Sequence, residues 1–140
     1  TRFMMSLKNA VELVDYAFNN GNQGDLLIQK APAATIKTLA EALIEIFESK
    51  SEIKIIGIRH GEKMHETLVT KEEMVKAEDL GNYFRIKSDS RSLNYEKYFT
   101  DGKISNGLPE EYNSNNTNDL NKEELIKILL ELPEVKSELI

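Results

Sequence analysis

The spacing of hydrophobic residues predicts two amphipathic helices in the first fifty residues. Between residues 7 and 18, apolar side chains recur every three or four positions, which is the period of one helical face. The same spacing returns between residues 36 and 47. Ser6 and Thr35 stand before these two runs and are good N-caps. The expected buried faces are Leu7, Ala10, Val11, Leu13, Val14, Ala17 and Phe18, and Ile36, Leu39, Ala40, Leu43, Ile44 and Phe47.

Two short apolar runs predict strands. Residues 25–30 contain three consecutive aliphatic side chains and are followed by Pro32, which interrupts regular structure. Residues 53–58 are rich in isoleucine, which favours a second strand. Residues 6–58 therefore read as helix, strand, helix, strand. This order suits an α/β unit with a small sheet, for which a parallel arrangement is one option.

The second half of the chain is more polar. Thr70 with Glu73 forms a capping box, which predicts a helix running to about residue 80, and residues 83–86 read as a short strand. The asparagine-rich run 113–118 predicts an exposed loop or a mobile linker.

A last helix is predicted over residues 121–132. Asn121 with Glu124 forms another capping box at its start, and Pro133 ends it. Its apolar stripe is wide and must be buried somewhere. The simple alternative is packing within this chain. The sharper prediction is docking on a neighbouring subunit or on another domain, because the polar run before it gives the helix slack.

Composition excludes several classes of protein. A chain of 140 residues can bury one sizeable core. The formal net charge of -6 argues against nucleic acid as a main partner. No apolar run reaches the length of a membrane span. The absence of cysteine removes disulfides and thiolate chemistry, which fits a cytoplasmic location.

The candidate chemistry stands at the end of the second predicted strand. Arg59 offers a planar fork of donors that suits a phosphate group. Gly61 permits a tight turn, and Glu62 can accept hydrogen bonds from a vicinal diol. A phosphate and a diol together are what a nucleotide sugar presents. The alternative is that this pattern forms a salt-bridged turn with no role in ligand binding.

Two other patterns do not support a site. His60 and His65 lie five residues apart, which does not stack two ligands on a helix, so a metal site is not predicted. Tyr83 and Lys87 fit the pattern Tyr-x-x-x-Lys, but the predicted strand places them roughly 13 Å apart, too far for a coupled acid–base pair.

Longer stretches around these residues resemble a known family. They are residues 58–68 (IRHGEKMHETL), 77–86 (AEDLGNYFRI), 93–99 (LNYEKYF) and the opening 1–6 (TRFMMS). They are similar to the C-terminal part of bacterial capsule and O-antigen nucleotide-sugar enzymes. These enzymes are extended short-chain dehydrogenases: UDP-N-acetylglucosamine 4,6-dehydratase/5-epimerases and relatives labelled UDP-glucose 4-epimerase.

The resemblance implies a role for three residues. Arg2 and Arg59 match arginines that contact the UDP diphosphate, and Glu62 matches the acid that binds the ribose. It implies a UDP-sugar as substrate, NADP as the cofactor of the parent enzyme, and a homo-oligomer as the complete assembly. His60 departs from the proline that is common at its position in relatives.

Parts of that family's pattern are missing from this sequence. Its seven glycines do not form the dinucleotide fingerprint G-x-G-x-x-G or its G-x-x-G-x-x-G variant. We therefore expect no catalytic, cofactor-binding or metal-binding residue in this chain, which alone should bind no NADP and turn over no substrate. The missing partner would be the nucleotide-binding half.

The implied fold class is α/β: a small helix–strand substrate-binding domain of an extended short-chain dehydrogenase, without the Rossmann half and with an extra C-terminal helix. Residues 1–103 would form the UDP-sugar-binding domain, and residues 104–140 a loop and helical extension. Two alternatives stay open: the C-terminal portion of a UDP-glucose or UDP-N-acetylglucosamine 4-epimerase, and a non-catalytic binding module or folded remnant.

Overall fold

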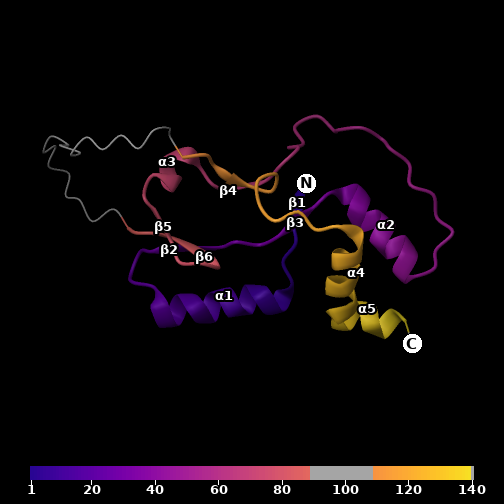
Figure 1. Ribbon diagram of the computed structural model, residues 1–140, viewed down its shortest axis with the longest axis horizontal. Coiled ribbons are helices and arrows are strands. Elements are labelled where there is room, and N and C mark those ends of the chain that lie inside the picture. Colours follow the sequence, from indigo (N-terminus) through magenta and orange to yellow (C-terminus); the bar gives the residue numbers. More distant parts are fainter. Residues whose placement is uncertain (89–108, 140) are drawn as a thin grey trace, which may run out of the picture. The chain divides into compact units, whose positions relative to one another are not determined.

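The computed structural model describes residues 1–88 and 109–139, and these residues form a mixed helix and strand fold (Figure 1). The chain forms two compact units, each built from separate stretches of sequence. The first contains residues 1–10, 31–67 and 113–140, and the second contains residues 11–30 and 68–112. The predicted boundary between residues 103 and 104 lies outside the described residues, as does the run 93–99. Within the described ranges, no helix is long and apolar enough to cross a membrane.

Three helices belong to the first unit, and their starts follow the sequence signals. Helix α2 (Ile36–Ile46) begins after Thr35, whose side-chain oxygen accepts a hydrogen bond from the backbone N–H of Thr38 at 2.9 Å. Helix α4 (Lys122–Glu131) begins with the predicted capping box of Asn121 and Glu124. A short helix α5 (Pro133–Glu138) follows it, with proline in its first turn, where the missing N–H is not needed.

The core of this unit lies between α2 and α4, which pack against each other (Figure 1). Leu125 of α4 is 1% exposed and contacts a cluster of small and aliphatic residues. An ion pair of 2.7 Å joins Lys122 to Glu45 of α2. The prediction that the last helix docks outside this chain is therefore wrong. The two buried alanines of the cluster let α4 approach closely, and the cluster is Ala34, Ala42, Leu120 and Leu125.

The first unit also contains a short ladder between β1 (Arg2–Phe3) and β3 (Ala33–Ala34), which run antiparallel. The asparagine-rich run 113–118 folds back beside this ladder: Ala33 donates to the carbonyl of Asn118 at 2.8 Å and accepts from Leu120 at 2.8 Å. The predicted loop is present, with Asn115, Asn116 and Asn118 exposed, but its bonds to Ala33 and the burial of Ser114 anchor it, so the alternative of a linker is not adopted. Asparagine side chains accept hydrogen bonds from nearby backbone N–H groups and fix the turn locally.

Residues 53–58 do not form the predicted strand. Their backbone is irregular, and Ile55, Ile56 and Ile58 are 86%, 71% and 63% exposed. A strand is stabilised by hydrogen bonds to a neighbouring strand. None of the strands in the described part of the chain pairs with this segment. The segment has the composition of a strand, but the described part of the chain offers it no neighbouring strand with which to pair.

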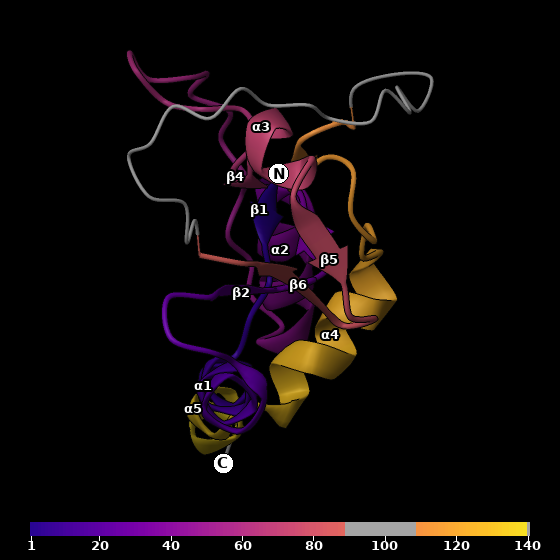
Figure 2. The same ribbon diagram turned by 90° about the vertical axis from the view of Figure 1, so that its left-hand side faces the viewer.

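The second unit is built around an antiparallel three-stranded sheet in the order β2-β6-β5. The parallel option is not adopted. The predicted strands over 25–30 and 83–86 are both present, and Figure 2 shows β5 beside β6. The strands are β2 (Leu26–Gln29), β6 (Tyr83–Ile86) and β5 (Ala77–Asp79).

Strand β5 occupies residues where a helix was predicted. The capping box of Thr70 and Glu73 is present, but helix α3 (Lys71–Met74) is a single turn. The chain then pairs with β6 instead of continuing as a helix, so the prediction of a helix to about residue 80 is wrong. Strands β4 (Thr67–Val69) and β7 (Tyr112–Asn113) pair as a further short ladder.

Helix α1 (Leu7–Asn20) starts where Ser6 predicts it, with the Ser6 hydroxyl accepting from the backbone N–H of Asn9 at 3.1 Å. Its Tyr16 ring stacks on Tyr83 of β6 with centroids 4.0 Å apart. The expected burial of its apolar face is wrong, because the described residues supply no layer over that face. Leu7, Val11, Val14 and Phe18 are all more than half exposed.

Candidate functional site

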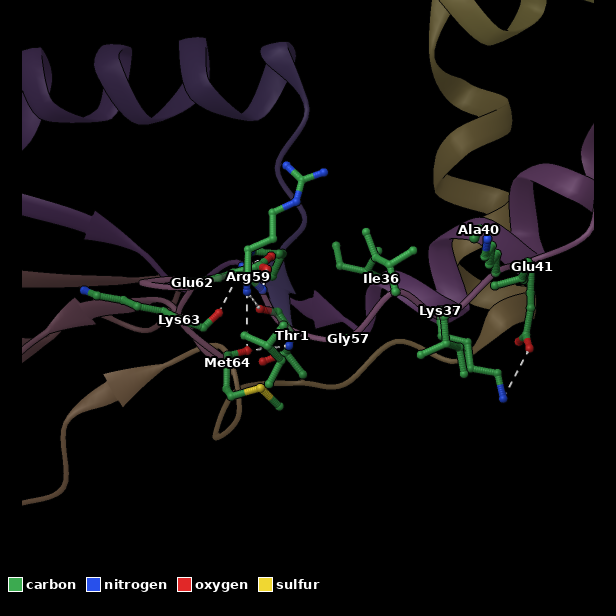
Figure 3. Close-up of a pocket in the computed structure, with 16 residues that line it drawn as sticks. Thr1, Ile36, Lys37, Ala40, Glu41, Gly57, Arg59, Glu62, Lys63 and Met64 are labelled. Atoms are coloured by element: carbon green, nitrogen blue, oxygen red, sulfur yellow. Dashed lines mark hydrogen bonds and ion pairs between the residues drawn. The ribbon is translucent and has the colours of Figure 1, made fainter.

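The three predicted site residues lie within the first unit, around one open cavity of about 820 Å³. The wall of this cavity comes from the start of the chain, from α2 and from the irregular segment that contains residues 53–64. Figure 3 shows Thr1, Glu62, Lys63 and Met64 gathered at one part of the wall, and Ile36, Lys37, Ala40 and Glu41 at another. Arg2, Arg59 and Glu62 all line it.

Arg59 and Glu62 are brought together by a tight turn. The backbone N–H of Glu62 donates to the carbonyl of Arg59 at 3.1 Å. Gly61 between them has φ +81°, the left-handed conformation that favours glycine, and this agrees with the predicted turn. One carboxylate oxygen of Glu62 accepts the backbone N–H of Arg59 at 3.1 Å. Two hydrogen bonds between Arg59 and Glu62 therefore close the turn. They keep the backbone of Arg59 next to the carboxylate of Glu62.

The guanidinium of Arg59 has none of its donors in use within the described part of the chain. Among the residues that the structure describes, no carboxylate pairs with it and no carbonyl accepts from it. Its backbone is fixed by the turn while its side chain lines the cavity. An arginine with free donors on a fixed backbone is suited to a bidentate anion such as a phosphate.

Arg2 is in a different situation, because its donors are already used. Its guanidinium donates to the carbonyls of Thr1 at 2.7 Å, Lys63 at 3.1 Å and Met64 at 3.3 Å. It also lies 3.7 Å from a carboxylate oxygen of Glu62 and 3.5 Å from one of Glu66. In this arrangement Arg2 holds the 62–66 segment in place.

The lining of the cavity is more basic than the chain as a whole. The chain carries a formal net charge of -6, yet five basic and two acidic side chains line the cavity. This local excess of positive charge favours an anionic ligand. Isoleucines from the 53–58 segment supply an apolar part of the wall. The charged residues are Arg2, Lys37, Lys54, Arg59 and Lys63, with Glu41 and Glu62.

One cluster beside this cavity has no signal in the sequence. The Thr1 hydroxyl lies 2.8 Å from Nδ1 of His65 and 2.7 Å from the hydroxyl of Ser114. Ser114 is 3% exposed and belongs to the asparagine-rich run. Its distance from Thr1 along the chain is 113 residues, and no spacing rule connects such positions. Within the described ranges, no three His, Asp or Glu side chains are grouped to hold a metal ion.

Comparison with known sequences adds a family to this geometry. The family described as "Polysaccharide biosynthesis protein" matches residues 1–88, and the one described as "Polysaccharide biosynthesis protein C-terminal" matches residues 89–136. The chain belongs to the polysaccharide biosynthesis protein family. All three predicted site residues lie in the first match, and Ser114 lies in the second.

Individual relatives of the polysaccharide biosynthesis family carry more specific names. Proteins of Rickettsia felis and Rickettsia bellii, both named UDP-glucose 4-epimerase, are 57% identical to this chain over 139 residues. The match covers 99% of this chain and 41% of each relative, so the chain spans about two-fifths of their length. The solved structure of Pen from Bacillus thuringiensis is 30% identical, with a TM-score of 0.69, over 92% of this chain and 36% of that one. The fold is accordingly that of part of a short-chain-dehydrogenase-like enzyme.

Proposed function

We propose that this chain is the substrate-binding portion of a UDP-sugar-modifying enzyme of surface polysaccharide synthesis, of the UDP-N-acetylglucosamine 4,6-dehydratase/5-epimerase type. The complete enzyme would bind the UDP-sugar between this portion and a nucleotide-binding half, as a cytoplasmic homo-oligomer. This chain would supply the grip on UDP and part of the sugar pocket.

The observation that carries the proposal is the free guanidinium of Arg59 in a basic cavity. A diphosphate presents several oxygens to which the arginine fork can donate two parallel hydrogen bonds. Charge-assisted hydrogen bonds of this kind are worth about 1.5–3 kcal/mol each. Membership of the polysaccharide biosynthesis family and the names of the Rickettsia relatives support a nucleotide sugar as the source of that diphosphate.

Glu62 would take the ribose. Its carboxylate already accepts one backbone N–H, but a carboxylate has about four acceptor positions, so a diol can donate to those that remain. For Arg2, a direct contact with the diphosphate stays a prediction. It would require Arg2 to exchange a carbonyl or carboxylate partner for a phosphate oxygen.

NADP does not fit the described part of this chain. A dinucleotide is held by a glycine-rich turn that opens a helix, so that the pyrophosphate meets the helix N-terminus. The residues before the starts of α2, α3, α4 and α5 are Thr35, Thr70, Asn121 and Leu132. Gly57, Gly61 and Gly81 stand in irregular segments and turns. We therefore assign the cofactor, and the hydride chemistry it would supply, to the remainder of the enzyme.

The proposal is tested by titrating the chain with UDP and, separately, with NADP, following backbone amide signals by NMR. UDP should bind weakly, with the largest shifts at Arg59 and Glu62, and NADP should not bind. Arg59→Ala should weaken UDP binding roughly 10- to 150-fold, the scale of the lost charged hydrogen bond. Arg59→Lys should recover only part of this, because a point charge does not replace the fork.

Lys50→Ala is the matched control, since Lys50 is an exposed basic residue that does not line the cavity. It should leave the affinity for UDP unchanged. Tight binding of NADP by this chain would contradict the assignment of the cofactor site to another segment. Equal losses in Arg59→Ala and Lys50→Ala would mean that Arg59 acts only through overall charge.

A second candidate is the C-terminal portion of a UDP-glucose 4-epimerase, which the names of the Rickettsia proteins favour. Both candidates use the same grip on UDP and differ in the sugar chemistry of the complete enzyme. Supplying UDP-N-acetylglucosamine or UDP-glucose to that enzyme, and identifying the product, separates them. A module with no catalytic partner would bind UDP without any such product.

A further inference from the structure

A buried serine distant in the sequence, Ser114, contacts the segment that carries Glu62. Ser114 is the polar residue that the described part of the chain buries most completely, at 3% exposure. Burying a hydroxyl is unfavourable unless its hydrogen bonds are made. What Ser114 bonds to therefore indicates what it does in this fold.

Ser114 holds the backbone of Glu66 at both of its polar groups. Its hydroxyl oxygen accepts the N–H of Glu66 at 3.0 Å, and its own N–H donates to the carbonyl of Glu66 at 2.8 Å. The hydroxyl also lies 2.7 Å from the Thr1 hydroxyl and 3.2 Å from the Thr1 carbonyl. One hydroxyl has one donor and two acceptor positions, so these contacts use its capacity.

Arg2 fixes the other end of the same segment. Its guanidinium binds the carbonyls of Lys63 and Met64 and stands close to the carboxylates of Glu62 and Glu66. The residues before this segment are irregular and largely exposed, so they supply few contacts of their own. The 62–66 segment, which continues from the Arg59–Glu62 turn, is thus bonded to both Arg2 and Ser114.

We infer that Ser114 is a positioning residue for the UDP-binding turn: it fixes Glu66, and through the 62–66 segment it fixes Glu62. This inference rests on the proposed function. The proposed ligand-facing residues all lie within residues 1–88, whereas Ser114 lies within residues 89–136, which match the C-terminal family description. The inference therefore assigns the second of these segments a role in the site.

The test uses the 140-residue chain with Ser114→Ala and two further variants. Ser114→Thr keeps the hydroxyl, and Ser137→Ala removes an exposed hydroxyl that bonds only within its own helical turn, to the carbonyl of Glu134. Amide hydrogen exchange measures whether the Ser114–Glu66 hydrogen bonds, here called the tether, are kept. NMR titration with UDP measures the affinity of the site for UDP. In Ser114→Ala we expect exchange at Glu66 to become about tenfold faster and UDP to bind about tenfold more weakly, the scale of one buried hydrogen bond.

Exchange in α2 and α4 should stay unchanged in Ser114→Ala, and Ser114→Thr should recover most of both effects. Unchanged UDP affinity in Ser114→Ala, or exchange that speeds equally throughout α2 and α4, would overturn the inference while leaving the proposed function intact. The wild-type chain could show no response to UDP while exchange at residues 62–66 is still faster in Ser114→Ala. That result would overturn the proposed function but would retain the role of Ser114 in holding this segment.

Discussion

Truncating Leu125 to alanine should be the most destabilising single change in the first unit. Burying a leucine completely stabilises a protein by about 1.5–3 kcal/mol, and Leu125 is 1% exposed. Its removal also leaves a cavity. The neighbours Ala34 and Ala42 are too short to reach into it, and both are held on regular elements. We therefore expect a loss of about 3–4 kcal/mol, within the range known for Leu→Ala in cores.

Leu130→Ala is the matched control, because Leu130 lies on the same helix but is 39% exposed. It removes the same atoms at a cost of about 1 kcal/mol. Urea unfolding followed by circular dichroism measures both. With a slope near 2 kcal/mol per molar urea, Leu125→Ala should lower the midpoint by about 1.5–2 M and Leu130→Ala by about 0.5 M.

Similar midpoints for the two variants would refute the reasoning. In that case α4 would not be held by burial against α2, and the last helix would be free to dock elsewhere, as its sequence pattern alone predicts. Leu125→Met, which conserves most of the volume, should cost less than about 1.5 kcal/mol and checks that the loss comes from the cavity.

Two further predictions concern charge and backbone. Hydrogen bonds from Lys87, and to a smaller extent from Arg85, hold the pKa of Glu78 below its ordinary value of 4.5. This carboxylate therefore stabilises the fold above pH 4.5, and the stabilisation is lost as the pH falls through the lowered pKa. Glu78→Gln should be less stable than wild type at pH 7 and show a shallower loss in acid titration; a parallel loss in both proteins would contradict this. Gly61→Ala forces a side chain into φ +81° at a cost of about 1 kcal/mol and should weaken UDP binding, whereas Gly61→Asn, which tolerates this conformation, should weaken it less. Equal binding of UDP by Gly61→Ala and wild type would show that the turn is not needed.

The features predicted correctly from sequence are those set by a few neighbouring residues. The caps at Ser6, Thr35, Thr70 and Asn121 are all present, because a capping side chain and the backbone N–H it accepts lie only three residues apart. The turn at Gly61 belongs to the same class, since one glycine supplies the required conformation.

The errors arise where distant pairing decides the structure. Residues 53–58 have the composition of a strand but pair with no strand of the described chain, and residues 77–79 leave a helical pattern to pair with β6. The sequence pattern of α4 shows that it has an apolar stripe, but not which surface covers that stripe. Local preference is weak compared with such tertiary contacts.

The candidate site divides in the same way. Arg59 and Glu62 could be found from sequence because the turn brings them together. The bonds that occupy Arg2 and those made by Ser114 could not, because they join residues that are between 48 and 113 positions apart. An asparagine-rich run predicts only a loop, and nothing in its sequence indicates that Ser114 contacts Glu66 and Thr1.

The interleaving of the two units has a consequence for how this polypeptide is made. The first unit needs β1 from the beginning of the chain, α2 from the middle and α4 from near residue 125, so its core cannot close while the ribosome is still adding residues in between. The apolar face of α2 therefore stays uncovered until α4 has left the ribosome. Closing loops of this length is entropically costly and slows folding. During synthesis, α2 therefore stays exposed to chaperones and to aggregation longer than its position in the sequence indicates.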